Sequence, residues 1–196
     1  RVSNAEHLAM SEDCGIVNLS HFHMVDIEGP DQVELLEWLC AAKIGGDANI
    51  GKGIYTHFLD DEGMVRADFT VFRMADRCRL VNGADAGPRD FHYMKRVAED
   101  RGLDVTITDT SEKYITIGIW GPNARATLKK AVADPAGLDP ENFPFAAIKQ
   151  IEIAGKNVTA FRISYVGEQG WELHMKYEDG LAVWDALRAT GVMAFG

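Results

Sequence analysis

The sequence predicts an α+β fold of two related strand–helix–strand sub-units with antiparallel sheets. An alternating, strand-like segment at 23–28 runs into Gly29-Pro30-Asp31 and then into residues with helical spacing. The alternating segment 114–120 runs in the same way into Gly121-Pro122-Asn123 and a second helical stretch. Further alternating segments separated by turn residues follow each unit, and this recurrence indicates two related halves.

The elements of the first half follow from these patterns in order. Apolar residues at helical spacing predict a helix over 33–40, and segments 55–59 and 64–73 around Asp60-Asp61-Glu62-Gly63 predict a hairpin. A third strand is predicted at 78–81. A helix over 91–101 should end at Gly102, because glycine accepts the left-handed conformation at a helix end. A strand over 103–108 then completes this half.

The second half begins with the strand 114–120 and a helix that carries Ala126, Leu128 and Val132. Three strands at 148–153, 158–165 and 171–175 and a final helix over 181–187 complete it. We therefore predict one half over residues 1–112 and another over 113–196. We also expect the chain to be part of a longer polypeptide, with the second half truncated and the C-terminal part missing.

Composition excludes several classes of protein. With 46% hydrophobic and 26% charged residues, the 196-residue chain is composed like a globular protein and unlike a disordered one. Its formal charge of -10 repels phosphate backbones and anionic lipid, so no nucleic acid partner is expected. No apolar run reaches the length of a membrane span, so no membrane partner is expected either. Three cysteines without a C-x-x-C pair suit a reducing compartment: the cytoplasm, or the mitochondrial matrix in a eukaryote.

Metal or cysteine chemistry finds little support in the sequence. His21 and His23 are two residues apart, but there is no His-Glu-x-x-His motif and the other histidines are scattered, so no metal site is predicted. Nothing near Cys14, Cys40 or Cys78 marks a thiolate of low pKa, and we expect these residues to be small buried hydrophobes.

Two segments are more informative. In 63–73 the residues Val65, Ala67, Phe69 and Val71 are apolar, so Arg66, Asp68 and Thr70 share the opposite face of a strand. That face is either a solvated surface or a site in which a carboxylate lies beside an arginine, and the pattern does not choose between the two.

The second segment is 164–174, predicted as two strands joined by a glycine-flanked turn. Trp171 and Leu173 point one way and Glu172 with His174 the other, so Glu172 could face a cavity with Tyr165 nearby across the turn. The alternative is an ordinary structural hairpin.

A family resemblance joins these segments. The run Ser164-Tyr-Val-Gly-Glu-Gln-Gly-Trp-Glu172 resembles the S/G-Y-x-G-E-x-G-[FYW]-E signature of the aminomethyltransferase family, which includes glycine cleavage T-protein and the folate-binding portions of dimethylglycine and sarcosine dehydrogenases. Five further segments resemble the family's motifs in the same order along the chain: Gly15–His21, Gly29–Asp31, Lys52–Tyr55, Gly63–Val71 and Gly121–Ala124.

The resemblance implies a T-protein-like fold that binds tetrahydrofolate in a central channel. Asp68 matches the family's acid beside the reactive folate nitrogens, which makes it the expected catalytic residue. Glu172 matches the acid that accepts hydrogen bonds from the pterin ring. Tyr55 and Tyr165 match tyrosines of the channel, and Asn82 matches an asparagine after the third strand. A buried carboxylate suits the paired N–H donors of a pterin.

The resemblance also implies an activity: one-carbon, aminomethyl or methylene, transfer to tetrahydrofolate. Ala67 before the acid and Trp171 in the signature look like the dehydrogenase branch, which implies a methylated amine as the donor and FAD in a domain before Arg1. A stand-alone T-protein, with an aminomethyl donor on a lipoyl carrier protein, or a folate-dependent demethylase is the alternative. A noncatalytic folate-binding protein is the alternative from another class.

Overall fold

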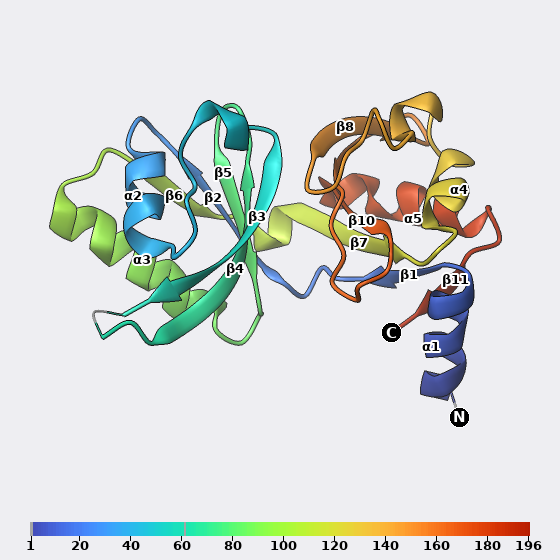
Figure 1. The fold of residues 1–196 in the computed structure, drawn as a ribbon, viewed down its shortest axis with the longest axis horizontal. Helices are drawn as coiled ribbons and strands as arrows, with labels where there is room; N and C mark the ends of the chain where they lie inside the picture. Colours follow the sequence, from blue (N-terminus) through green and yellow to red (C-terminus); the bar gives the residue numbers. More distant parts are fainter. Residues whose placement is uncertain (1, 61) are drawn as a thin grey trace. The chain divides into compact units, whose positions relative to one another are not determined.

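The computed structural model describes residues 2–60 and 62–196, which form two compact units. The middle unit comprises His21–Glu112. The terminal unit comprises Lys113–Gly196 together with the described residues that precede His21 (Figure 1). Both units combine helices with a sheet, so the α+β fold predicted from the sequence is confirmed.

The middle unit contains a five-stranded sheet in the order β3-β4-β5-β2-β6, in which all neighbouring strands are antiparallel. Its strands are β2 (His23–Glu28), β3 (Lys52–Leu59), β4 (Val65–Arg73), β5 (Cys78–Asn82) and β6 (Thr106–Asp109). Its helices are α2 (Gln32–Leu39) and α3 (Gly87–Arg101), and a short 3-10 helix, η1, covers Asp47–Asn49. A second 3-10 helix, η2 (Ser111–Lys113), lies where the chain leaves this unit.

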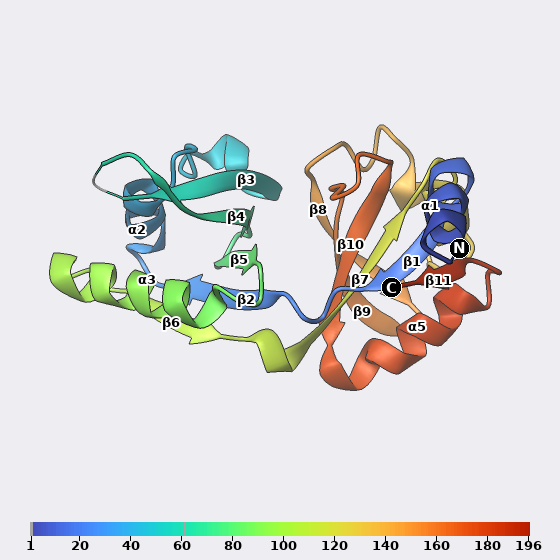
Figure 2. The same ribbon diagram turned by 90° about the horizontal axis from the view of Figure 1, so that it is seen from below.

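The terminal unit contains a six-stranded sheet in the order β11-β1-β7-β10-β9-β8 (Figure 2). Its strands are β1 (Gly15–Asn18), β7 (Tyr114–Trp120), β8 (Ile148–Ile153), β9 (Lys156–Phe161), β10 (Gly170–Lys176) and β11 (Met193–Phe195). Its helices are α1 (Val2–Glu12), α4 (Ala124–Lys129) and α5 (Gly180–Arg188), with 3-10 turns η3 (Ala136–Leu138) and η4 (Tyr177–Asp179). The pair β1–β11 is parallel and the other pairs are antiparallel.

Each unit has its own hydrophobic core on one face of its sheet. In the middle unit, leucines of α2 and Met94 of α3 pack on Val25, Val71 and Leu80 of the sheet. In the terminal unit, Leu128 of α4 and Leu187 of α5 are buried in one cluster with apolar residues of β7 and β10. Because side chains alternate along a strand, the residues between these core positions point to the other face of each sheet. That second face carries most of the polar residues discussed below.

The two units repeat the same order of elements, as the sequence predicts. The order is β2-α2-β3-β4-β5-α3-β6 in the middle unit and β7-α4-β8-β9-β10-α5-β11 in the terminal unit. In the middle unit β2 pairs with β5, and in the terminal unit β7 pairs with β10 in the same way. They differ at one edge. In the middle unit β6 pairs directly with β2, whereas in the terminal unit β1 is inserted between β7 and β11.

The insertion of β1 bears on the predicted division at residues 112 and 113. In the structure the middle unit ends at Glu112 and the chain continues into the terminal unit at Lys113. The residues before His21, however, pack with the second half, because β1 hydrogen-bonds along β7 from Gly15 to Asn18. This pairing is formed by residues that are far apart in the sequence, and the hydrophobic pattern of the chain does not encode it.

The turns that follow β2 and β7 require glycine. Gly29 has a φ of 120° and Gly121 a φ of 137°. A Cβ atom at Gly29 would lie 2.6 Å from the carbonyl oxygen of Asp104, and one at Gly121 would lie 2.3 Å from the carbonyl oxygen of Asp13. Both the backbone conformation and the close approach of a second segment therefore exclude a side chain.

Several predicted boundaries move in the structure. The helix predicted over 91–101 begins at Gly87, with a proline in its first turn, and ends at Gly102 with a φ of 67° as expected. The strand predicted over 158–165 is β9, which ends at Phe161, so Tyr165 lies in the loop before β10 and not in a hairpin strand. The predicted hairpin β3–β4 is present, and Asp60 closes its turn by accepting hydrogen bonds from the backbone of Glu62 and Met64. Asp61 of that turn lies outside the described residues. Within the described ranges no helix is long and apolar enough to cross a membrane.

Replacing Gly121 by alanine is expected to lower the free energy of unfolding by about 1–3 kcal/mol or more, since the new Cβ is both strained and crowded. Urea denaturation of the wild-type and variant proteins measures the difference. Gly83→Ala is the control, because a Cβ at Gly83 meets nothing within 4 Å and its φ is not positive. The control should stay within about 0.5 kcal/mol of wild type. Equal stability of the two variants would contradict the role assigned to the turn.

Candidate functional site

The hairpin β3–β4 brings Tyr55, His57 and Asp68 together on the face of the middle sheet away from α2 and α3. His57 and Asp68 are directly opposite each other across the two strands. The Tyr55 hydroxyl donates a hydrogen bond to Asp68 Oδ2 at 3.4 Å, and the rings of Tyr55 and His57 meet edge-on with centroids 5.2 Å apart. Two of the residues predicted from the sequence, Tyr55 and Asp68, are therefore in contact.

His57 was not predicted as a site residue. The sequence offered one signal, since His57 is two positions after Tyr55 and must share its strand face. Its position opposite Asp68, in contrast, depends on the register of β3 on β4.

A β-bulge lies beside this cluster. The pairing of β3 with β4 shifts between Phe58 and Leu59, so that Arg66 is the extra residue of β4. The Arg66 guanidinium lies 4.0 Å over the ring of Tyr93 in α3. The expectation that Arg66 shares a strand face with Asp68 is therefore wrong, because the bulge turns Arg66 toward α3, where it makes a cation–π contact.

The environment of Tyr55 affects its ionisation. Desolvation, followed by the charge of the Asp68 carboxylate and the hydrogen bond to it, raises the pKa of Tyr55 above its ordinary value. The Tyr55 side chain is nevertheless 63% exposed. An exposed tyrosine that donates to a carboxylate stays protonated at neutral pH and keeps its ring face available for contact.

Asn82 lies on a different face from Asp68. Thr70 of β4 is paired with Val81 of β5, so alternation turns Asn82 toward the helices. There its Nδ2 donates to Asp90 Oδ2 of α3 at 3.1 Å, and Asp90 is fully buried. The Oδ1 atom of Asn82 is buried with no hydrogen-bond partner among the described residues. The structure does not bring Asn82 to the cluster of Tyr55 and Asp68.

Glu172 and His174 lie on the face of the terminal sheet away from α4 and α5, as the alternation of β10 predicts. Glu172 is 6% exposed and His174 1% exposed. The Nε2 atom of His174 is 3.5 Å from Glu172 Oε2. Across the neighbouring strands, Glu172 is paired with Gly118 of β7 and with Phe161 of β9. The carboxylate is therefore held in a nearly buried setting with an imidazole beside it.

Tyr165 and Trp120 form an aromatic pair in the terminal unit. Tyr165 is 74% exposed, and its ring centroid lies 6.4 Å from that of the buried Trp120. The indole Nε1 of Trp120 donates to the carbonyl oxygen of Ile163 at 3.1 Å, which ties the loop after β9 to β7. Trp120 was not predicted as a site residue. The sequence contains one signal for it: Trp120 shares a strand face with Gly118, which has no side chain of its own.

The cysteines and histidines do not form a reactive cluster within the described residues. Burial raises the pKa of Cys14 and of Cys78 to about 11 and that of Cys40 to about 12, so all three thiols stay protonated at neutral pH. The Nε2 atom of His23 lies 3.2 Å from Asp109 Oδ2, and His21 precedes β2. No group of three or more potential metal ligands occurs in the part of the chain that the structure describes.

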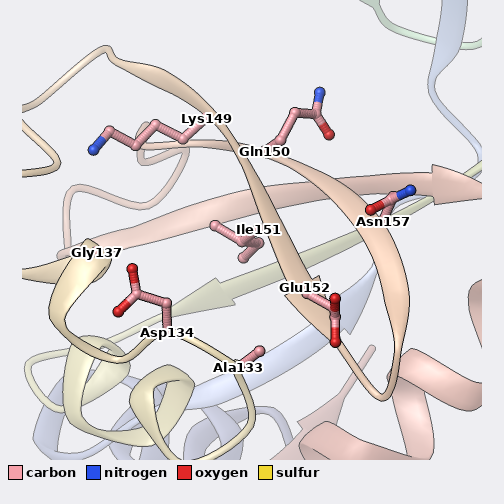
Figure 3. A pocket seen from close by; sticks show the side chains of 8 residues that line it. All are labelled: Ala133, Asp134, Gly137, Lys149, Gln150, Ile151, Glu152 and Asn157. Atoms are coloured by element: carbon pink, nitrogen blue, oxygen red, sulfur yellow. The ribbon is translucent and has the colours of Figure 1, made fainter.

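A cavity of about 320 Å³ lies in the terminal unit beside the hairpin β8–β9 (Figure 3). None of the residues predicted from the sequence lines it, and its lining mixes both charge signs with amides. Its walls are formed by Ala133, Asp134, Gly137, Lys149, Gln150, Ile151, Glu152 and Asn157.

Comparison with known proteins gives consistent matches along the whole chain. The family model of the GCVT N-terminal domain matches residues 1–196. The chain is 31% identical over 192 residues to the mitochondrial dimethylglycine dehydrogenase of Rattus norvegicus, covering 97% of this chain and 22% of that protein. It is 32% identical over 194 residues to the aminomethyltransferase of Listeria welshimeri, covering 98% and 51%. The chain thus spans about half of one relative and about a fifth of the other.

The fold matches a solved structure as well. Aminomethyltransferase T of the glycine cleavage system from Bartonella henselae superimposes with a TM-score of 0.83 at 24% identity, covering 98% of this chain and 50% of that protein. The T-protein-like fold expected from the motifs is confirmed.

Replacing Asp68 by asparagine is expected to lower the pKa of Tyr55 toward its ordinary value of about 10, because a neutral amide no longer disfavours the phenolate. In the wild type, the raised pKa stabilises the fold fully below about pH 10, and this contribution disappears as the pH rises through the folded-state value. Titration of tyrosinate absorbance in wild type, Asp68→Asn and Tyr55→Phe assigns the shift. Identical titration curves for wild type and Asp68→Asn would show that the two side chains do not interact.

Proposed function

Because the chain belongs to the GCVT N-terminal domain family, we propose that it is the folate-binding part of an enzyme that transfers a one-carbon unit to tetrahydrofolate. The observation that carries the proposal is the contact between Tyr55 and Asp68, two residues that the family's motifs assign to the folate site and that the hairpin β3–β4 brings within 3.4 Å. The dehydrogenase and aminomethyltransferase relatives, whose names denote amine oxidation and aminomethyl transfer, support it.

Asp68 has the properties of a group that orients and deprotonates a nitrogen. Its side chain is exposed on the sheet, so a ligand can reach it, and the Tyr55 hydroxyl bonds to only one of its oxygens. The other oxygen is available to accept an N–H. Bound tetrahydrofolate would supply the nitrogen that takes up the one-carbon unit. Asp68 would hold that N–H and accept the proton released on transfer, and such general-base help is typically worth about 10²- to 10⁴-fold.

Glu172 has the properties of an acceptor for the pterin ring. Its carboxylate is nearly buried, where hydrogen bonds from N–H donors to a charged acceptor are stronger than neutral ones. A buried carboxylate needs such donors, because burial without them costs free energy. The donor set of a pterin fits this requirement.

The tyrosines and Asn82 complete the proposed contacts. Tyr55 and Tyr165 expose 63% and 74% of their surface, and exposed aromatic rings of this kind suit stacking against a flat heterocycle or its aryl extension. For Asn82 we propose a single contact, since its amide nitrogen already donates a hydrogen bond to Asp90. Only its buried Oδ1 remains to accept a hydrogen bond.

Asp68→Asn tests the proposal directly. In the intact protein we expect methylene transfer to tetrahydrofolate to fall by roughly 10²-fold or more, because the variant keeps the shape and loses the base. Tetrahydrofolate binding, measured by calorimetry, should fall much less, because Glu172 and the tyrosines remain. Asp100→Asn, an exposed carboxylate of α3, is the matched control and should leave both unchanged.

Two results would contradict the proposal. An unchanged rate of one-carbon transfer by Asp68→Asn at saturating folate would show that Asp68 is a solvated surface residue without a catalytic role. Tetrahydrofolate binding with no transfer by the wild type, for any amine or aminomethyl donor, would instead favour the noncatalytic folate-binding alternative.

The donor of the one-carbon unit is proposed to be a methylated amine that a flavin oxidises, on the strength of Ala67 and Trp171 in the motifs. The described residues of this chain do not themselves fit a flavin. Their sheets contain a single parallel pair, β1–β11, and no strand leads through a glycine-rich phosphate loop into a helix. Any FAD must therefore be bound by other parts of the protein.

The intact protein is accordingly expected to show the visible absorption bands of a flavin, and these bands should bleach when a methylated glycine is added. The absorption spectrum of the purified protein is the measurement. A colourless preparation without flavin would reject the dehydrogenase assignment. The stand-alone aminomethyltransferase, which takes its donor from a lipoyl carrier protein, would then be the assignment to test.

A further inference from the structure

The internal repeat places two very different pairs at equivalent positions of the two units. In the middle unit Asp26 of β2 is paired in register with Arg79 of β5. Asp26 accepts from Arg79 through both oxygens, at 2.7 and 2.8 Å, and both residues are at most 3% exposed. Asp26 lies three residues before the turn glycine Gly29. The buried guanidinium of Arg79 binds this carboxylate in a bidentate arrangement, and Arg77 Nη1 donates to Asp26 Oδ2 as well, at 3.4 Å.

The terminal unit has a glycine in place of the acid and a glutamate in place of the arginine, so no such ion pair can form there. The residue three positions before Gly121 is Gly118, and it is paired in register with Glu172. A Cβ at Gly118 would lie 2.3 Å from the ring of Trp120. The indole therefore occupies the space that a cationic side chain at position 118 would need. The middle unit thus has the ion pair Asp26–Arg79, whereas at the equivalent place in the terminal unit Glu172 lies next to the ring of Trp120.

Among the described residues, His174 lies within ion-pair distance of Glu172. Its Nε2 atom lies 3.5 Å from Oε2, and its side chain has no exposed surface. The imidazole ring packs against Phe161 in a tilted arrangement, with centroids 4.5 Å apart. A separation of 3.5 Å is long for a hydrogen bond, so the contact attracts Oε2 while leaving lone pairs on both oxygens for other donors.

We propose that His174 is a positioning residue that holds the Glu172 carboxylate in place for the paired N–H donors of a ligand. This inference rests on the proposed function of Glu172 as the acceptor for a pterin-like ring. A carboxylate as nearly buried as that of Glu172 costs free energy when it has no partner, so a side chain that attracts it also restricts where it points. His174 selects one orientation before the ligand binds, and this reduces the entropic cost of binding.

The inference predicts that His174 acts only through Glu172. We expect His174→Leu to weaken tetrahydrofolate binding by about tenfold, with a loss of similar or greater size for Glu172→Gln. The double variant should bind no more weakly than Glu172→Gln alone, because nothing remains for His174 to position. His174→Gln, whose amide nitrogen can take the place of Nε2, should restore binding to within about threefold of wild type.

The experiment is calorimetric titration of the intact proteins with tetrahydrofolate, with melting temperatures recorded for every variant. Thr116→Val is the matched control, since Thr116 is buried and is paired with His174 across β7 and β10. It perturbs the packing without removing the imidazole and should bind folate like wild type. The folate-saturated rate of one-carbon transfer should be unchanged in His174→Leu, because Asp68 is intact.

The outcomes separate the inference from the function on which it rests. Wild-type binding by Glu172→Gln would overturn the assignment of Glu172 and the inference with it. Impaired binding by Glu172→Gln together with wild-type binding by His174→Leu would overturn the inference alone. Additive losses in the double variant would also overturn it, because His174 would then act independently of Glu172. If His174→Leu does not fold, equal binding by His174→Gln and the shorter His174→Asn would overturn the inference, whereas rescue by Gln alone supports it.

Discussion

A backbone turn that leaves no room for a Cβ atom connects β2 to α2 in the middle unit and β7 to α4 in the terminal unit. At Gly29 and Gly121 the chain reverses with a positive φ against the backbone of a second segment, at Asp104 and Asp13 respectively. This close approach places each helix on one face of its sheet, and the apolar residues of that face form the core. The other face of each sheet is then free of the packing that the core requires, and polar residues can lie on it.

The polar faces of the two units have diverged although the backbones repeat. In the middle unit, Asp26 and Arg79 form a buried ion pair, whereas Tyr55 and Asp68 of the hairpin β3–β4 are exposed. In the terminal unit, Gly118 replaces the acid and Glu172 replaces the arginine. A closed ion pair stabilises or specifies a fold, whereas a carboxylate facing an indole is suited to accept donors from a ligand. The comparison within one chain indicates which positions serve structure and which serve binding.

The sequence gives a good account of strand faces because the two-residue period is a local property. The period predicts that Asp68 and Phe69 point to different faces of their strand. It also predicts that Glu172 and His174 point to one face and Leu173 to the other, and the structure agrees at each of these positions. It fails for Tyr165, which lies in a loop because β9 ends at Phe161, four residues earlier than the apolar pattern suggests. Asn82 is a failure of another kind: its residue type suits a binding site, but the register of β5 turns it toward Asp90.

The sequence by itself determined the helices and strands from β2 to α5, the repeat of strand, glycine turn and helix, and the family, because each of these is encoded in short runs of residues; β1 and β11 were not predicted. Only the tertiary structure decided which distant residues meet. The pairing of β1 with β7 joins the start of the chain to its second half, and the register of β3 on β4 sets His57 opposite Asp68. The physical reason is that strand pairing is a hydrogen-bonded contact between two segments, which are adjacent in the chain for β3–β4 and far apart for β1–β7. Its register depends on turns, bulges and core packing together, and no local pattern contains that information.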